Sequence, residues 1–331
     1  RIFYRIGFYL LQKFINTFIF FTNKITDLHK VTAHSRIANL TNVRVYCDTF
    51  TARIERGAGR AGIERLPYFP ELIVDTLAGT KHLIVVGSKP PVGFFAYPDK
   101  PSWLTPDDCA LHTLATPEQD GVDALERLAH ALGAEKSDVT ILPLNKFELP
   151  QGDLSLETIG MAIAALLPEN AIVAEEAITS GFPLLPMTAN SPPHDWLMVP
   201  GGAIGGGLPM ATGAAIACPD RKVLSLQADG SGMYTLQALW TQAREGLNVT
   251  TVIYANREYR ILNIEFERVG AGEQGKTARD MFALDRPELD WVKLAEGMGV
   301  TARRVSTLED FGKTLTVFMN EAGPNLIEVV L

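Results

Sequence analysis

Cysteine is scarce in this sequence of 331 residues, where only Cys47, Cys109 and Cys218 occur, far apart. Their odd number and wide spacing exclude a disulfide framework and a cysteine-ligated zinc site, so we expect buried thiols in a reducing compartment, which favours the cytoplasm. Acidic residues outnumber basic ones, 38 to 30, and no basic stripe accompanies the motifs, which excludes nucleic acid as an expected partner.

Long apolar runs are also missing. Residues 6–21 come nearest, but polar side chains interrupt them, and a membrane span needs about 20 mostly apolar residues. We therefore expect no membrane span. An interfacial amphipathic helix or a targeting peptide stays open for this segment, although no cleavage site is evident.

The remaining composition is that of a globular enzyme. Hydrophobic residues make up 47% of the chain and charged residues 21%, and the length predicts two domains. Residues 1–42 differ in composition from the rest of the chain. They contain six lysines and arginines against one acid, a net charge of +5 (6 − 1), and are rich in phenylalanine and tyrosine. We expect them to be a leader outside both domains, and leave them unassigned.

The most informative stretch runs from Val223 to Ile261. A short apolar run ends at Ala228-Asp229-Gly230-Ser231-Gly232, where the glycines permit a tight strand-to-helix turn. Apolar residues at helical spacing follow over 233–243, Gly246 ends that helix, and a second apolar run over 249–255 leads into Asn256. This pattern predicts a β-α-β unit with parallel strands, which brings Asp229 and Asn256 to one sheet edge.

The chemistry of this pair suits a hard cation. Asp229 offers a charged oxygen, Asn256 an amide oxygen, and Glu258 a backbone carbonyl. Three such ligands leave octahedral positions free, as Mg²⁺ prefers when phosphate and water complete its shell. The turn at Gly230 and Ser231 offers backbone N–H groups to a diphosphate. Taken alone, the residues fit better with an Asp at a turn and an Asn closing a strand.

The stretch resembles the thiamine diphosphate signature, Gly-Asp-Gly followed after a spacer by Asn-Asn. The separation of 27 positions (256 − 229) is that of the pyruvate decarboxylase and acetolactate synthase superfamily. The resemblance implies that Asp229, Asn256 and the Glu258 carbonyl hold Mg²⁺ beside thiamine diphosphate. Ala228 and Ala255 depart from the motif, but both ligand positions are kept.

Further cofactor residues follow from the same resemblance. It implies that Gly202 supplies a carbonyl to the aminopyrimidine and that Ile204 bends the cofactor, although an isoleucine is ordinarily a core residue. Thr179 and Ser180 would donate hydroxyls to the diphosphate, or lie in a polar turn. Tyr259 and Ile261 would stand near the thiazolium and the substrate. The glycines over 200–209 lack the spacing of a dinucleotide fingerprint.

The predicted fold class is α/β, with two parallel-sheet sandwich units. Residues 43–133 resemble part of the middle domain of acetolactate-synthase-like proteins, residues 134–152 read as a linker, and residues 153–331 resemble the pyrophosphate (PP) domain. Within the first of these, residues 53–70 look like a loop. Some relatives bind FAD in the middle domain, but no motif here supports it.

The resemblance implies decarboxylation or carboligation of 2-oxo acids, as in acetolactate synthase. In relatives, the activating Glu comes from a pyrimidine-binding domain for which this chain has no counterpart, so the catalytic residue is not assigned. We therefore expect a truncated chain that is inactive alone, and either a homodimer or a partner that supplies that domain. The alternatives are a benzoylformate decarboxylase-like enzyme and a non-catalytic nucleotide-binding or interaction scaffold.

Overall fold

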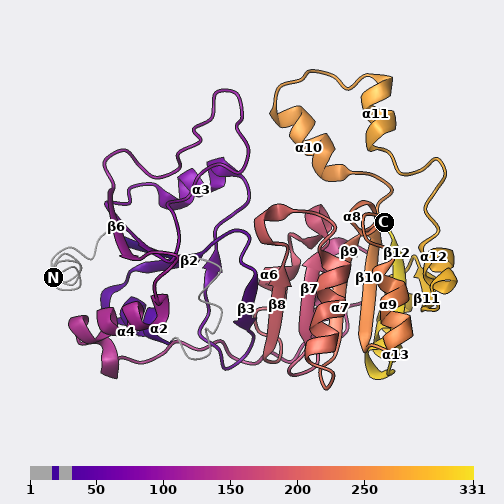
Figure 1. Ribbon diagram of the computed structural model, residues 1–331, viewed down its shortest axis with the longest axis horizontal. Helices are drawn as coiled ribbons and strands as arrows, with labels where there is room; N and C mark the ends of the chain where they lie inside the picture. Colours follow the sequence, from indigo (N-terminus) through magenta and orange to yellow (C-terminus); the bar gives the residue numbers. More distant parts are fainter. Residues whose placement is uncertain (1–16, 22–31) are drawn as a thin grey trace. The chain divides into compact units, whose positions relative to one another are not determined.

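The computed structural model describes residues 17–21 and 32–331, and its elements are labelled in Figure 1. The chain forms two compact units. The first comprises the described residues up to Glu55 together with Gly59–Leu142, and the second comprises Arg56–Ala58 and Pro143–Leu331. This division does not test the predicted middle domain, linker and PP domain, and these assignments stay predictions.

The first unit is built on a parallel five-stranded sheet. Its strand order is β4 (Glu64–Arg65), β2 (Arg44–Cys47), β1 (Thr17–Phe21), β5 (His82–Val86) and β6 (Ala110–Ala115). Its helices are α2 (Ala33–Thr41), α3 (Pro70–Leu77) and α4 (Gly121–Leu132), followed by the 3₁₀ turn η1 (Ala134–Lys136). Residues 53–70 contain β3 (Arg53–Arg56) and β4, and are not only a loop.

Strand β1 lies in the middle of this sheet, between β2 and β5. Its side chains alternate, so that Ile19 packs with α2 and α4, whereas Phe18 and Phe20 pack on the opposite face with the apolar residues of α3. On α2, Ile37 is fully buried in the same cluster as Ile19. The expectation of a leader outside the domains is therefore wrong for residues 17–21 and 33–41, while residues 1–16 and 22–31 lie outside the described part.

The second unit is built on a seven-stranded sheet. Its order is β11 (Thr301–Val305), β12 (Asn325–Val330), β10 (Val249–Ala255), β9 (Val223–Ala228), β7 (Ile172–Glu176), β8 (His194–Met198) and β3, and the pairs from β11 to β8 are parallel. Its longer helices are α5 (Leu156–Leu166), α7 (Gly207–Ala217), α9 (Ala238–Glu245), α10 (Arg260–Arg268) and α13 (Leu308–Asn320). The shorter ones are η2 (Ile178–Gly181), α6 (Leu184–Met187), η3 (Pro200–Gly202), α8 (Asp229–Gly232), α11 (Lys276–Phe282) and α12 (Trp291–Gly297).

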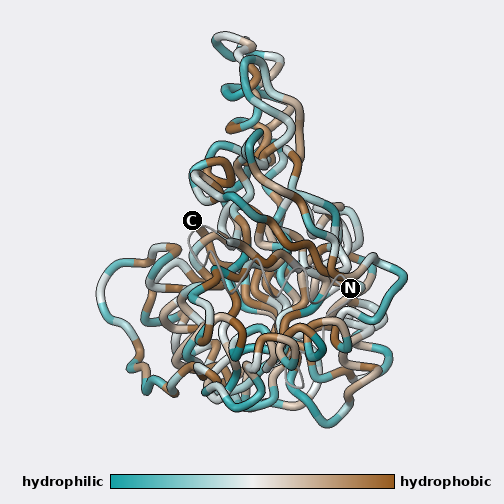
Figure 2. The backbone as a smooth tube through the Cα atoms, turned by 90° about the vertical axis from the view of Figure 1, so that its left-hand side faces the viewer, coloured by the Kyte–Doolittle hydropathy of each residue, from teal (hydrophilic) through white to brown (hydrophobic). Residues whose placement is uncertain are grey.

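Parallel strands buried on both faces explain the apolar runs of the sequence. All seven residues of β10 are buried, and Figure 2 shows hydrophobic stretches of the backbone, in brown, gathered in the interior. Ile253 packs in one cluster with Trp291 and Leu208, which belong to α12 and α7. The predicted α/β class with parallel sheets is confirmed.

One predicted helix is shorter than expected. Helix α9 begins at Ala238, and Met233 and Leu236 lie in turns before it, while Trp240 is 52% exposed. Helix α8 has only one turn and ends at Gly232. The apolar residues at helical spacing over 233–243 therefore begin in the turns between α8 and α9 and continue into α9. Gly246 ends α9 with a φ of 59°, as the sequence predicted.

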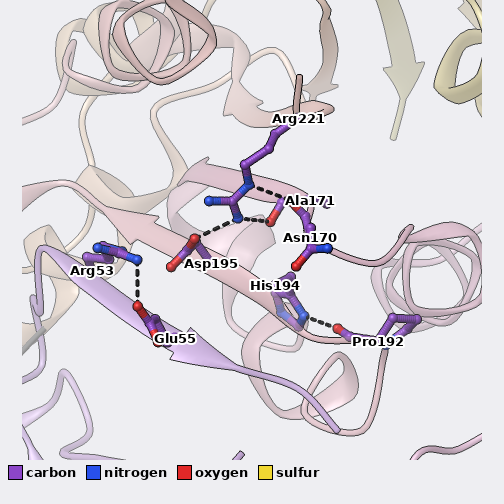
Figure 3. A network of polar contacts seen from close by, with 8 residues as sticks. All are labelled: Arg53, Glu55, Asn170, Ala171, Pro192, His194, Asp195 and Arg221. Atoms are coloured by element: carbon purple, nitrogen blue, oxygen red, sulfur yellow. Dashed lines mark hydrogen bonds and ion pairs between the residues drawn. The ribbon is translucent and has the colours of Figure 1, made fainter. Parts of the chain in front are cut away.

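At the amino ends of the strands, a polar network joins β7, β8 and β9 (Figure 3). The Arg221 guanidinium donates to the Asp195 carboxylate at 2.6 Å and to the carbonyl oxygens of Asn170 and Ala171 at 2.6 and 3.1 Å. The imidazole of His194 bonds to the Pro192 carbonyl at 2.7 Å. These bonds satisfy backbone groups at the edge opposite the predicted site.

Two expectations from composition can also be compared with the structure. Cys47 is buried, whereas Cys109 and Cys218 are partly exposed, so the prediction of buried thiols holds for one of the three. Over residues 17–21 and 32–331, there is no helix long and apolar enough to cross a membrane.

Candidate functional site

The predicted site stands at the carboxyl ends of two neighbouring strands. Strands β9 and β10 pair directly and in parallel, with Ala228 opposite Tyr254. Asp229 follows β9 and Asn256 follows β10, so both lie at one edge of the sheet. The adjacency on which the predicted ligand pair depends is therefore present.

Asp229 is the buried centre of this edge, with 2% of its surface exposed. Its Oδ1 accepts from the Gly230 N–H at 2.8 Å and its Oδ2 from the Arg257 N–H at 2.7 Å. Burial outweighs these two bonds and raises the pKa of Asp229 to about 6. No residue in the described part of the chain forms an ion pair with this carboxylate.

The turn after β10 brings the other two predicted ligands to the same place. Arg257 adopts a φ of 61°, which folds the chain back so that its N–H reaches Asp229. The Asn256 side-chain oxygen accepts from the Glu258 N–H at 3.1 Å. The Glu258 carboxylate accepts from the Asn263 side-chain amide at 2.9 Å, and so this side chain is engaged within the turn and α10.

The donor set fits Mg²⁺ with thiamine diphosphate. A buried carboxylate without a cationic partner stands beside an amide oxygen, and both are hard oxygen donors. No cluster of three or more His, Cys, Asp or Glu that could hold a metal occurs within residues 17–21 and 32–331. The predicted magnesium site has only one carboxylate and does not depend on such a cluster.

The Gly230-Ser231 turn is buried and tightly covered. A Cβ on Gly230 would lie 2.6 Å from the Tyr259 ring, so the ring packs on the glycine and excludes a side chain. The Ser231 hydroxyl accepts from the Gln227 amide at 2.6 Å and lies 3.2 Å from the carbonyl oxygens of Glu176 and Ala228. This hydroxyl and the Gly230 N–H, which donates to Asp229 Oδ1, are therefore engaged within the chain, and the predicted diphosphate role rests on the other backbone N–H groups of the turn.

The glycine-rich loop before α7 depends on a residue that the sequence analysis did not single out. The carboxylate of Glu176, at the end of β7, accepts from the backbone N–H groups of Gly205, Gly206 and Gly207. A usable signal was present, because an acid at the end of a buried apolar strand must find donors. Gly202, at a φ of 67°, and Ile204, 40% exposed, lie in the same loop.

The remaining predicted residues flank this edge. Thr179 is half-buried and Ser180 buried in η2, the turn that follows β7 and lies close to β9 and to helix α10. Tyr259 directly precedes α10, and Ile261 is half-buried within it. Contacts thus join Asp229 and Gly230 with the turn after Asn256 and with Tyr259. For Ile204 and Ile261, the structure gives only their place in the loop and the helix.

The sequence matches proteins of a known family. Residues 184–329 match the family of thiamine pyrophosphate enzymes, C-terminal TPP binding domain. A Mycobacterium tuberculosis protein provisionally named acetolactate synthase large subunit IlvX is 50% identical over 305 residues, which cover 91% of this chain and 58% of that protein. Benzoylformate decarboxylase of Pseudomonas aeruginosa is 33% identical over 178 residues, 54% of this chain and 32% of that enzyme.

The fold has counterparts among solved structures. The thiamine diphosphate-dependent 4-hydroxybenzoylformate decarboxylase of Rhodococcus jostii RHA1 superposes with a TM-score of 0.76 at 24% identity, over 99% of this chain and 63% of that one. At this identity, the likeness concerns the fold alone.

The matched proteins are thiamine diphosphate-dependent enzymes, and residues 184–329 match the C-terminal TPP binding domain of that class. Within this class, the chain resembles acetolactate synthase large subunits, with the decarboxylases as further relatives. The chain spans 58% of the length of the most extensively aligned of these relatives.

Proposed function

We propose that this chain binds Mg²⁺ and thiamine diphosphate and forms part of an acetolactate synthase-like enzyme that decarboxylates or joins 2-oxo acids. One observation carries the proposal: the Arg257 N–H bond to Asp229 holds the end of β9 and the turn after β10 together. The carboxylate of Asp229 and the amide oxygen of Asn256 thereby share one edge, where a cation can bridge them to a diphosphate.

Each residue would have a defined task in binding. Asp229 and the Asn256 oxygen would hold the cation with the Glu258 carbonyl, and the backbone at Gly230 and Ser231 would receive the diphosphate. The bound cofactor would supply the carbanion that adds to the 2-oxo acid and the ring that delocalises electrons after carbon dioxide leaves. Tyr259, on Gly230, would limit the access of water to the diphosphate.

Further cofactor contacts are proposed at the edges of this site. Gly202 and Ile204 would contact the aminopyrimidine, and Ile204 is exposed enough to do so. Thr179 and Ser180 would approach the diphosphate from η2, and Ile261 the substrate from α10. Mutual burial of such groups around one ligand is how an enclosed cofactor site excludes water.

We infer further that turnover needs an activating Glu, for which no residue of this sequence is assigned. A polypeptide of these 331 residues should therefore bind the cofactor without consuming 2-oxo acids. The chain would form a homodimer or pair with another chain, and only a partner that carries a pyrimidine-binding domain would supply that Glu. Robust pyruvate consumption by the purified chain with cofactor and no partner would contradict this inference.

A second function is supported by the identity to benzoylformate decarboxylase over 178 residues. Such an enzyme would release an aldehyde, whereas an acetolactate synthase joins two carbon skeletons. Product analysis of the completed enzyme with pyruvate and with benzoylformate separates the two.

Calorimetry tests cofactor binding directly. Thiamine diphosphate titrated into the chain at saturating Mg²⁺ should bind, and Asp229→Ala should lower the affinity at least tenfold. Asp310→Ala is the matched control, because Asp310 is an exposed acid in the first turn of α13, remote from the site in sequence and on another element. Equal affinities of the wild type and Asp229→Ala would favour a non-catalytic scaffold that lacks this site.

A further inference from the structure

The carboxylate of Glu176 occupies the amino end of helix α7. Its Oε1 accepts from the N–H groups of Gly205 and Gly206 at 2.5 and 3.2 Å, and its Oε2 accepts from Gly207 at 2.9 Å. Glu176 is 2% exposed. Charge-assisted bonds to three successive amides, together with the dipole of an eleven-residue helix, stabilise this buried charge.

The position of Glu176 follows from strand register. Glu176 and Gln227 are direct partners on the neighbouring strands β7 and β9, so their side chains leave the same face of the sheet. The Gln227 amide donates to Glu176 Oε2 at 2.7 Å and to the Ser231 hydroxyl at 2.6 Å. Gln227 thus connects the carboxylate that holds the loop with the turn that follows Asp229.

The loop tolerates no side chain where it meets this carboxylate. A Cβ on Gly207 would lie 2.3 Å from Gln227 Oε1 and 2.7 Å from Glu176 Oε2. The close approach of the backbone is therefore what permits all three amides to reach one carboxylate. These amides are committed to Glu176, so they are not available to an external anion such as a diphosphate.

From this arrangement, we propose that Glu176 is a positioning residue: its carboxylate shapes the glycine-rich loop and, through Gln227, the Asp229 turn, before the cofactor binds. The proposal rests on the proposed function and deepens it. Gly202 and Ile204 lie in the loop that Glu176 holds, whereas Asp229 and Gly230 begin the turn that Gln227 braces through Ser231. A loop that is fixed in advance loses less conformational entropy on binding, and this raises affinity.

Glu176→Gln tests the proposal with little change in volume. It removes the charge and turns one acceptor into a donor that faces the amides. We expect hydrogen exchange of the Gly205–Gly207 amides in the cofactor-free chain to accelerate at least tenfold. The calorimetric Kd for thiamine diphosphate at saturating Mg²⁺ should rise at least tenfold, and Glu176→Asp should restore part of both.

Glu328→Gln is the matched control. Glu328 is a buried carboxylate of the same sheet, 1% exposed, and its partner is Arg304 of the neighbouring strand, at 3.0 Å. Its loss should lower stability but leave loop exchange and the Kd within twofold of the wild type. If Glu176→Gln does not fold, Gly207→Ala perturbs the same contact from the loop side and should give the same two changes.

The outcomes separate the two proposals. Unchanged exchange at Gly205–Gly207 in Glu176→Gln overturns the positioning role, and so does faster exchange with unchanged affinity. A wild-type chain that binds no thiamine diphosphate overturns the proposed function instead. In that case, the difference in hydrogen exchange at Gly205–Gly207 between the wild type and Glu176→Gln decides whether Glu176 shapes the loop.

Discussion

Replacing Asp229 by Asn should stabilise the metal-free chain while it removes cofactor binding. Burial raises the pKa of Asp229 from its ordinary value of 3.8 to about 6. A shift of roughly two units corresponds to about 3 kcal/mol at neutral pH, by which the ionised carboxylate destabilises the folded state. Asparagine carries no charge but loses one of the two backbone bonds, at a cost of about 1–2 kcal/mol. The expected net gain is about 1–2 kcal/mol.

Urea unfolding at pH 7.5 in the presence of a chelator measures this difference. Between pH 3.8 and 6, the folded wild type binds more protons at Asp229 than the unfolded chain does, so this carboxyl lowers the free energy of unfolding as the pH rises. The advantage of Asp229→Asn should therefore vanish below pH 4. With Mg²⁺ and thiamine diphosphate at about 100 times Kd, the wild type should gain about 2.7 kcal/mol and become the more stable. An Asn variant that is less stable than the wild type without metal would refute the reasoning.

Three further outcomes follow from packing and burial. Ile19→Ala should lower the free energy of unfolding by about 2–5 kcal/mol in urea titrations, because Ile19 is fully buried. The control Leu40→Ala should change it little, because that side chain is 42% exposed. Equal effects of the two variants would contradict the central place of β1. Burial lowers the pKa of His194 to about 4, so its contribution to stability is complete above pH 6.5 and is lost as the pH falls towards 4. His194→Gln should therefore reduce the dependence of the free energy of unfolding on pH between 4 and 6.5, as measured by urea unfolding at several pH values. Gly232→Ala should cost about 1–3 kcal/mol and shift tryptophan fluorescence, since its Cβ would lie 2.8 Å from the buried Trp291 ring, and an unshifted spectrum would argue against this contact.

Much of the candidate site at the ends of β9 and β10 could be predicted from the sequence, because it depends on local patterns. The apolar runs fix β9 and β10, the glycines fix the turn, and parallel pairing then brings Asp229 near Asn256. The hydrogen bond from the Arg257 N–H to Asp229 could not be predicted, because it depends on a positive φ at a non-glycine residue.

Glu176 and β1 escaped prediction for a different reason. The partners of Glu176 are amides about thirty residues away, and no local pattern encodes such a contact. Strand β1 lies in a basic, aromatic segment whose composition suggested a leader. Its burial follows from pairing with β5, more than sixty residues downstream, and hydropathy along the chain does not reveal such pairing.

The central position of β1 also constrains how the first sheet can assemble. Both neighbours of β1 come later in the chain, so the sheet is continuous only when β1 pairs with both of them. A protease cut or an internal translation start beyond residue 21 would remove β1. Strands β2 and β5 would then each have an edge of unpaired backbone N–H and C=O groups that can pair with another strand. Such edges recruit strands from other molecules, and shortened products of this chain should therefore aggregate rather than persist as smaller folded domains.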